Sequence, residues 1–160
     1  MKHPLYALLL LPLAGILAWV LWGGGRNGSG AGFMPVAQGV VFTPQSYDAD
    51  TIFDYMDGGA ELYLKHGFKS LKVWTGKAGE VEVTVEMYLL DSPENAGALF
   101  ESMKSGSVIR IAETSTAVLN GSGVASAGKF FLRAFTYPEQ DGPPRQVLDS
   151  FARWFHAQNS

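Results

Sequence analysis

Two carboxylates and a pair of glycines lie close together between Asp57 and Tyr63, where the sequence reads DGGAELY. Asp57 and Glu61 have the i, i+4 spacing that places side chains on one face of a helix. Such a pair could act as general acid and base, with Tyr63 or His66 assisting. The glycines could also let a ligand or a partner's backbone approach closely. The candidate ligand or partner contacts are therefore Asp57, Gly58, Gly59, Glu61 and Tyr63, and the only catalytic candidates are Glu61 and Asp57.

The same glycines also have a structural explanation. A helical pattern runs from Asp50 to Lys65, with Phe53, Met56, Ala60 and Tyr63 on one side. Adjacent glycines inside a helix cost about 2 kcal/mol relative to alanine, whereas glycine at a helix end is common. The glycines would then mark a helix end or a close contact with a sheet, and Glu61 would accept hydrogen bonds from nearby backbone. We favour this explanation.

Metal binding is the other chemistry that this acidic region suggests. Counted from Asp48, a calcium loop of the EF-hand type would have Ile52 at position 5 and Gly59 at position 12, so the pattern fails. His66 and His156 lack a partner at metal-binding spacing. The sequence has no cysteine, which excludes disulfides, thiolate nucleophiles and iron–sulfur ligation. We assign no metal and no cofactor.

The clearest strand runs from Glu80 to Leu90, where apolar and polar residues alternate. Glu80, Glu82 and Glu86 share its polar face and could be acid–base carboxylates, but a solvated face is the simpler interpretation. Residues 68–75 should pair with this strand through the turn 76–79. The preferred register sets Val73 opposite Val81 and Lys72 opposite Glu82.

Other segments have equally local signals. Residues 129–137 are apolar on both faces apart from Arg133, which predicts a central strand. Asn120-Gly121 predicts a hairpin turn. Ser92 and Pro93 predict the start of a helix, and the stripe from Val147 to Phe155 predicts a C-terminal helix that covers the sheet. The fold class is therefore α+β, with a central, mainly antiparallel β-sheet and helices packed on one face, preceded by one N-terminal transmembrane helix.

The segments around Asp57 and Ser92 are similar to those of a known family. Tyr47 to Phe68, centred on FDYMDGGAELY, and the later DSPENA resemble the DUF6599 family of uncharacterised exported bacterial and archaeal proteins. The resemblance covers about Val41 to Phe155. The family has asparagine where Asp57 stands, which separates this chain from the usual form. It implies an exported α+β domain and supplies no reaction.

The first 22 residues predict a membrane anchor. Leu5 to Trp22 is an apolar run of 18 residues without a charge, close to the length of about 20 that spans a bilayer. Trp19 and Trp22 are typical of the aromatic belt of a retained helix, although Pro12 would kink it. A cleaved signal peptide is the alternative. With Lys2 on the inner side, we expect a single-pass protein of the cytoplasmic (inner) membrane with its N-terminus inside and a periplasmic body.

The rest of the chain divides into a glycine-rich flexible linker at 23–35 and one extracytoplasmic domain at 36–160. Without Lys2 and Arg26, the chain has ten of its twelve basic residues and all fifteen acidic ones, which gives this part a net charge of about −5. Such a charge argues against nucleic acid as a partner.

Together these features predict a membrane-tethered accessory or binding domain that is a partner or subunit of an envelope or membrane-complex process. Its expected partners are the membrane, through the N-terminal helix, and a protein of a membrane complex. No convergent set of nucleophile, base and oxyanion donors can be recognised, which favours binding over catalysis. Two alternatives remain, a small envelope hydrolase or lyase that uses Glu61 and Asp57, and a solute-binding module.

Overall fold

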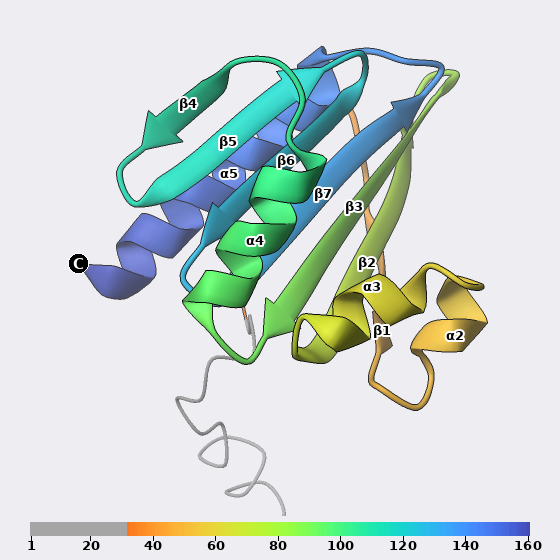
Figure 1. The fold of residues 1–160 in the computed structure, drawn as a ribbon. Coiled ribbons are helices and arrows are strands. Elements are labelled where there is room, and N and C mark those ends of the chain that lie inside the picture. The colour runs from red at the N-terminus through yellow and green to blue at the C-terminus, as the bar shows by residue number, and fades with distance from the viewer. Residues whose placement is uncertain (1–31) are drawn as a thin grey trace, which may run out of the picture.

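The computed structural model describes residues 32–160, which form a seven-stranded antiparallel sheet in the order β1-β2-β3-β7-β6-β5-β4 (Figure 1). The α+β class is confirmed. The strands are β1 (Thr43–Tyr47), β2 (Phe68–Ala78), β3 (Val81–Leu90), β4 (Val108–Ile111), β5 (Thr114–Leu119), β6 (Ser122–Ala127) and β7 (Phe130–Tyr137). The helices are α2 (Ile52–Tyr55), α3 (Ala60–Lys65), α4 (Pro93–Met103) and α5 (Gly142–Asn159).

The expected transmembrane helix at 1–22 and most of the linker lie outside the described residues. Within residues 32–160, none of the helices combines the length and the apolar character that crossing a bilayer requires.

Helices cover both faces of the sheet, so the expectation of helices on one face was wrong. In Figure 1, α5 lies behind the sheet, whereas α2, α3 and α4 lie in front of it. Each side has its own buried cluster, one around α5 and the other under α2, α3 and α4. The strands β3 and β7 contribute to both clusters because successive side chains of a strand point to opposite faces.

The α5 face is closed by the predicted C-terminal helix together with an extended N-terminal segment. Val147, Leu148 and Phe151 are buried against the sheet, which confirms the predicted stripe. In the segment that precedes β1, Phe33 is 3% exposed and packs edge-on against Phe151, with ring centroids 5.6 Å apart. Phe33 and the buried Pro35 therefore belong to the domain and not to the linker, which was expected to reach residue 35.

Two hairpin expectations have different outcomes. Asn120 and Gly121 both have positive φ, at 51° and 70°, and join β5 to β6 as predicted. The β2–β3 hairpin is longer than expected, since Ala78 pairs with Val81 and Lys77 with Glu82. The predicted register was wrong because residues 76–78 continue the strand, and the turn needs only Gly79, with φ 62°, and Glu80.

The helical pattern at residues 50–65 is two short helices, α2 and α3, with a break at the glycines. Gly58 has φ 63° and Gly59 is the N-cap of α3, as the structural explanation of these glycines requires. Ile52 is the buried residue of α2, whereas Phe53, expected on the apolar side, is 50% exposed. The break changes the direction of the chain, so one continuous helical periodicity does not apply across it.

The start of α4 is as predicted, because the Ser92 hydroxyl accepts a hydrogen bond from the Asn95 backbone N–H at 3.2 Å. Ala96, Leu99 and Phe100 face the sheet and are buried.

Candidate functional site

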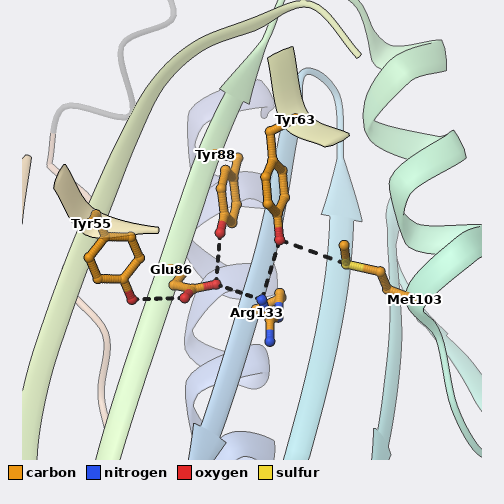
Figure 2. A network of polar contacts seen from close by, with 6 residues as sticks. All are labelled: Tyr55, Tyr63, Glu86, Tyr88, Met103 and Arg133. Carbon is orange, nitrogen blue, oxygen red and sulfur yellow. Dashed lines mark hydrogen bonds and ion pairs between the residues drawn. The ribbon is translucent and has the colours of Figure 1, made fainter. Parts of the chain in front are cut away.

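Glu86 is a carboxylate in the middle of β3 and is only 4% exposed. Its Oε1 accepts a hydrogen bond from the Tyr55 hydroxyl and its Oε2 accepts one from the Tyr88 hydroxyl, both at 2.8 Å. Oε2 also forms an ion pair with Nη1 of Arg133 at 3.2 Å (Figure 2). A buried charge without partners costs several kcal/mol, so these three contacts are what allow a carboxylate at this depth.

The elements that hold this network come from three parts of the chain. In the β3–β7 pairing, Glu86 lies directly opposite Arg133, so the sheet register itself brings the two charges together. Tyr88 follows two positions later on the same face of β3. The helix α2 ends at Tyr55 and places this phenol beside the carboxylate from the β1 side of the sheet.

The burial of Glu86 overturns part of the sequence interpretation. A solvated polar face was expected for all three glutamates of this strand. Glu80 and Glu82 are exposed, as expected, but Glu86 is buried because α2 and α3 cross this end of β3. Alternation along a strand predicts which residues share a face, but it does not predict which part of that face another element covers.

Arg133 is the half-buried member of the network, with 33% of its side chain exposed. Its Nη1 makes the ion pair to Glu86 and also donates a hydrogen bond to the Tyr63 hydroxyl at 3.3 Å. The guanidinium carbon lies 5.2 Å from the centroid of the Phe135 ring, two positions along the same strand. Within residues 32–160, neither Nε nor Nη2 has a hydrogen bond or ion pair, and in Figure 2 a second guanidinium nitrogen points away from the five other labelled side chains.

Stacked tyrosines hold the helix side of the network. The rings of Tyr63 and Tyr88 are parallel, with centroids 4.0 Å apart and an interplanar angle of 5°. The Tyr63 hydroxyl donates to the Met103 sulfur at 4.0 Å while it accepts from Arg133. The network therefore connects α3 and α4, which lie on the same face of the sheet.

The electrostatics of the network affect the protonation of Tyr55, Tyr88 and Arg133. Burial raises the pKa of Tyr55 and Tyr88 above their ordinary value of 10.0, and the Glu86 carboxylate adds to this rise. Burial alone would lower the pKa of Arg133, but Glu86, Tyr63 and Tyr88 together outweigh this effect, and the pKa is raised. Tyr55 and Tyr88 therefore stay neutral hydrogen-bond donors at neutral pH, and the guanidinium stays charged.

Beyond this network, no helix of residues 32–160 covers the same face of the sheet, as the upper ends of β2, β3 and β7 in Figure 1 show. We call this region the open half. Its floor is a row of residues that lie opposite one another on neighbouring strands, so all point to one face. The row consists of Thr43 (β1), Thr75 (β2), Thr84 (β3), Phe135 (β7) and Ser122 (β6).

A shallow hollow of about 400 Å³ lies over the three threonines of this row. The ion pair between Lys77 and Glu82, at 2.8 Å, forms its outer end. None of the hydroxyl groups of Thr43, Thr75 and Thr84 has a hydrogen-bond partner in the described part of the chain. Phe135 is not part of the lining of the hollow, but it lies opposite Thr84 on the neighbouring strand and has the Arg133 guanidinium above its ring. The open half thus combines free hydroxyls, an aromatic surface and a charged donor.

A second hollow, of about 350 Å³, lies between the edge strand β4 and α5. Its lining combines apolar side chains, such as Ile109, Ile111 and Leu148, with the charged Arg145 and Asp149. Within residues 32–160, the side chains of Arg145 and Asp149 have no hydrogen bond or ion pair that holds them in place, unlike Arg133 beside Glu86. We therefore take the open half as the candidate site.

Of the candidates between Asp57 and Tyr63, the structure brings only one into this site, whereas two of the strand glutamates belong to it, Glu86 in the network and Glu82 at the end of the hollow. Tyr63 is buried and belongs to the network, whereas Asp57, Gly58, Gly59 and Glu61 are exposed on the loop and helix outside it. Neither carboxylate has a hydrogen bond or an ion pair among residues 32–160. The proposed backbone partners of Glu61 are therefore not observed.

His66, the other residue named as assisting catalysis, is hydrogen-bonded to its own helix. His66 donates from Nδ1 to the backbone carbonyl of Leu62 at 2.8 Å, at the end of α3. In the region that the structure describes, histidine, aspartate and glutamate side chains nowhere gather in a group of three that could hold a metal ion.

Sequence reasoning did not identify Glu86 and Arg133 as a pair. One signal was available, because Arg133 is the only charged residue between Phe130 and Tyr137 in a strand predicted to be central. A charge in such a strand needs a partner of opposite sign, and the partner could be named only once the neighbour of β7 was known.

Comparisons with protein-family models, curated proteins and solved structures found no match to this chain. The resemblance to the DUF6599 family is neither supported nor contradicted by them, and it stays a prediction.

Proposed function

We propose that this protein is a membrane-tethered extracytoplasmic binding domain, an accessory module of an envelope or membrane-complex process, which presents its open half to a ligand or partner. The apolar run at residues 5–22 and the glycine-rich segment after it support the tether. The net negative charge supports a partner other than nucleic acid.

A single observation carries the binding role. In the part of the chain that the structure describes, helices cover the face opposite α5 only at one end. Arg133 lies at the boundary of this cover, and two of its nitrogens have no hydrogen bond or ion pair to residues 32–160. The network around Glu86 limits the orientations of this guanidinium, so little side-chain entropy is lost when something binds it. A group held in place beside an uncovered surface is what a recognition site requires.

The hydrolase or lyase alternative has weaker support. It requires Asp57 and Glu61 to converge in a cleft where burial raises a carboxyl pKa, and both side chains are exposed. Glu86 is only 4% exposed, and two phenols and a guanidinium surround its oxygens, so a substrate has little access to this carboxylate.

Native mass spectrometry of the full-length protein, extracted gently from its own membrane, tests this proposal. We expect an intact N-terminus and a stoichiometric companion, either a protein or a small molecule. A trimmed chain would contradict the tether. An intact chain that never carries a companion, even after mild cross-linking in the membrane, would contradict the binding role.

A further inference from the structure

The free edge of Arg133 has the geometry that recognises a carboxylate. A guanidinium carries five N–H donors in a rigid fork. Both contacts of Arg133 within residues 32–160 use Nη1, which leaves the side formed by Nε and Nη2. Two N–H groups point in parallel from that side, and they match the two oxygens of a carboxylate in a bidentate pair.

The charge around Arg133 favours an anion with a single charge. The Glu86 carboxylate, 3.2 Å from Nη1, compensates much of the guanidinium charge. A second anion on the other edge is repelled by Glu86, and the repulsion is larger for a doubly charged group such as phosphate. A carboxylate combines the planar shape with the smaller charge.

The surroundings of this edge indicate what the rest of the ligand carries. The ring of Phe135 lies below the guanidinium and offers a flat apolar surface. Next to it, the hydroxyls of Thr84, Thr75 and Thr43 line the hollow, and hydroxyls both donate and accept hydrogen bonds. A ligand with hydroxyl groups and one flat apolar side, as in a sugar ring, matches such a floor.

We infer that the open half binds the carboxylate of a sugar acid, with Arg133 Nε and Nη2 as the donors to the carboxylate and the threonine row as the contact surface for the hydroxyls. This inference rests on the proposed function, because it names the ligand class of the same surface.

The test is an NMR titration of the full-length protein in neutral detergent, with the arginine Nε–Hε resonances observed. The probes are glucuronate, glucose, acetate and inorganic phosphate. We expect glucuronate to shift the Arg133 resonance to saturation and glucose to leave it unchanged. The exposed Arg110, Arg145 and Arg153 are internal controls. An Arg133 resonance that does not move, or that moves only in parallel with these three, would overturn the inference.

The other two probes separate the parts of the inference. Acetate should bind at least several-fold more weakly than glucuronate, because it reaches Arg133 but not the threonines. Equal affinities for acetate and glucuronate would contradict the proposed contacts between the sugar hydroxyls and the threonines. If phosphate binds as tightly as glucuronate, Arg133 belongs to a general anion site and not to a carboxylate site, which would contradict the inference.

Two substitutions have opposite expected effects, which a merely structural role would not produce. Arg133→Gln should weaken glucuronate binding roughly tenfold or more, because the charged bidentate pair is lost. Glu86→Gln should strengthen binding roughly threefold, because the repelling charge is removed while the amide oxygen still accepts from a phenol. Circular dichroism verifies folding. If the Arg133 variant does not fold, the Glu86 variant decides alone, and weaker binding by a folded Glu86→Gln protein would contradict the inference.

The two proposals can fail separately. A companion found by native mass spectrometry, combined with no response to glucuronate, would contradict the ligand class and leave the binding role standing.

Discussion

The two faces of the sheet are built from the same strands but are closed to different extents. On the α5 face, an 18-residue helix and the segment that begins at Phe33 cover the strands with apolar and aromatic side chains. On the opposite face, the short helices α2 and α3 and the 11-residue α4 cover one end, and the cover finishes at a charged network.

This difference separates stability from recognition within one sheet. The aromatic cluster on the α5 face buries large rings and supplies hydrophobic stabilisation. The indole N–H groups of Trp74 and Trp154 are buried in it without a hydrogen-bond partner among residues 32–160, which offsets a part of this gain. The network of Glu86 and Arg133 stabilises far less, because desolvation of the two charges offsets most of their attraction. The network instead fixes the position and orientation of the Arg133 guanidinium at the border of the open half.

The largest effect is expected from Phe151→Ala on the closed face. Phe151 is 0% exposed and contacts Phe33 and Trp154, so the free energy of unfolding should fall by about 3–5 kcal/mol. Urea unfolding of the full-length protein measures it. Phe53→Ala is the control, since Phe53 is 50% exposed, and it should cost less than about 1 kcal/mol. Similar losses for the two variants would contradict the assignment of the main core to the α5 face.

A smaller loss is expected from Glu86→Ala in the network. The change leaves two phenols and the Arg133 guanidinium without their acceptor, and we expect a loss of about 2–4 kcal/mol. The matched control is Glu82→Ala on the same strand face, whose ion pair with Lys77 is exposed and should contribute about 0–1 kcal/mol. The same denaturation assay compares them, and equal costs would show that the network is not buried in solution.

The smallest effect at neutral pH is expected from Tyr88→Phe, at about 1 kcal/mol for one lost hydrogen bond. Its alkaline behaviour is more informative. Burial and the Glu86 charge raise the pKa of Tyr88 above 10.0, so above that pH the unfolded phenol loses its proton before the folded one. The stabilisation by Tyr88 is complete below about pH 10 and is lost as the pH rises further.

Unfolding curves between about pH 9 and about pH 11 test this linkage. The wild-type stability should fall more steeply with pH than that of Tyr88→Phe, by up to about 1.4 kcal/mol per pH unit for one proton. Parallel pH profiles would mean that Tyr88 ionises as freely in the folded protein as in the unfolded chain.

Local patterns predicted much of the fold correctly. The Asn120-Gly121 turn, the Ser92 cap and the apolar stripe of α5 depend on residues within one or two turns of each other. The central position of β7 followed from its apolar residues on both faces. In each case the physical cause lies within a few neighbouring residues, so no knowledge of distant contacts was needed.

The candidate site was predicted less well, because its parts meet only through distant pairing. Asp57 and Glu61 attracted attention by their density and spacing, yet they lie outside the network. Tyr63 was named correctly, but for a role beside those carboxylates and not beside Arg133.

The sequence by itself determined where strands, turns and helices form, and it determined that one arginine would lie in an apolar strand. Only the tertiary structure decided that Arg133 lies opposite Glu86, that α2 brings the Tyr55 hydroxyl to Glu86, and that the helices of residues 32–160 cover this face no further. Local conformation depends on neighbouring residues. Burial and charge pairing depend on which elements meet, and the free energy of the whole packed domain sets that arrangement.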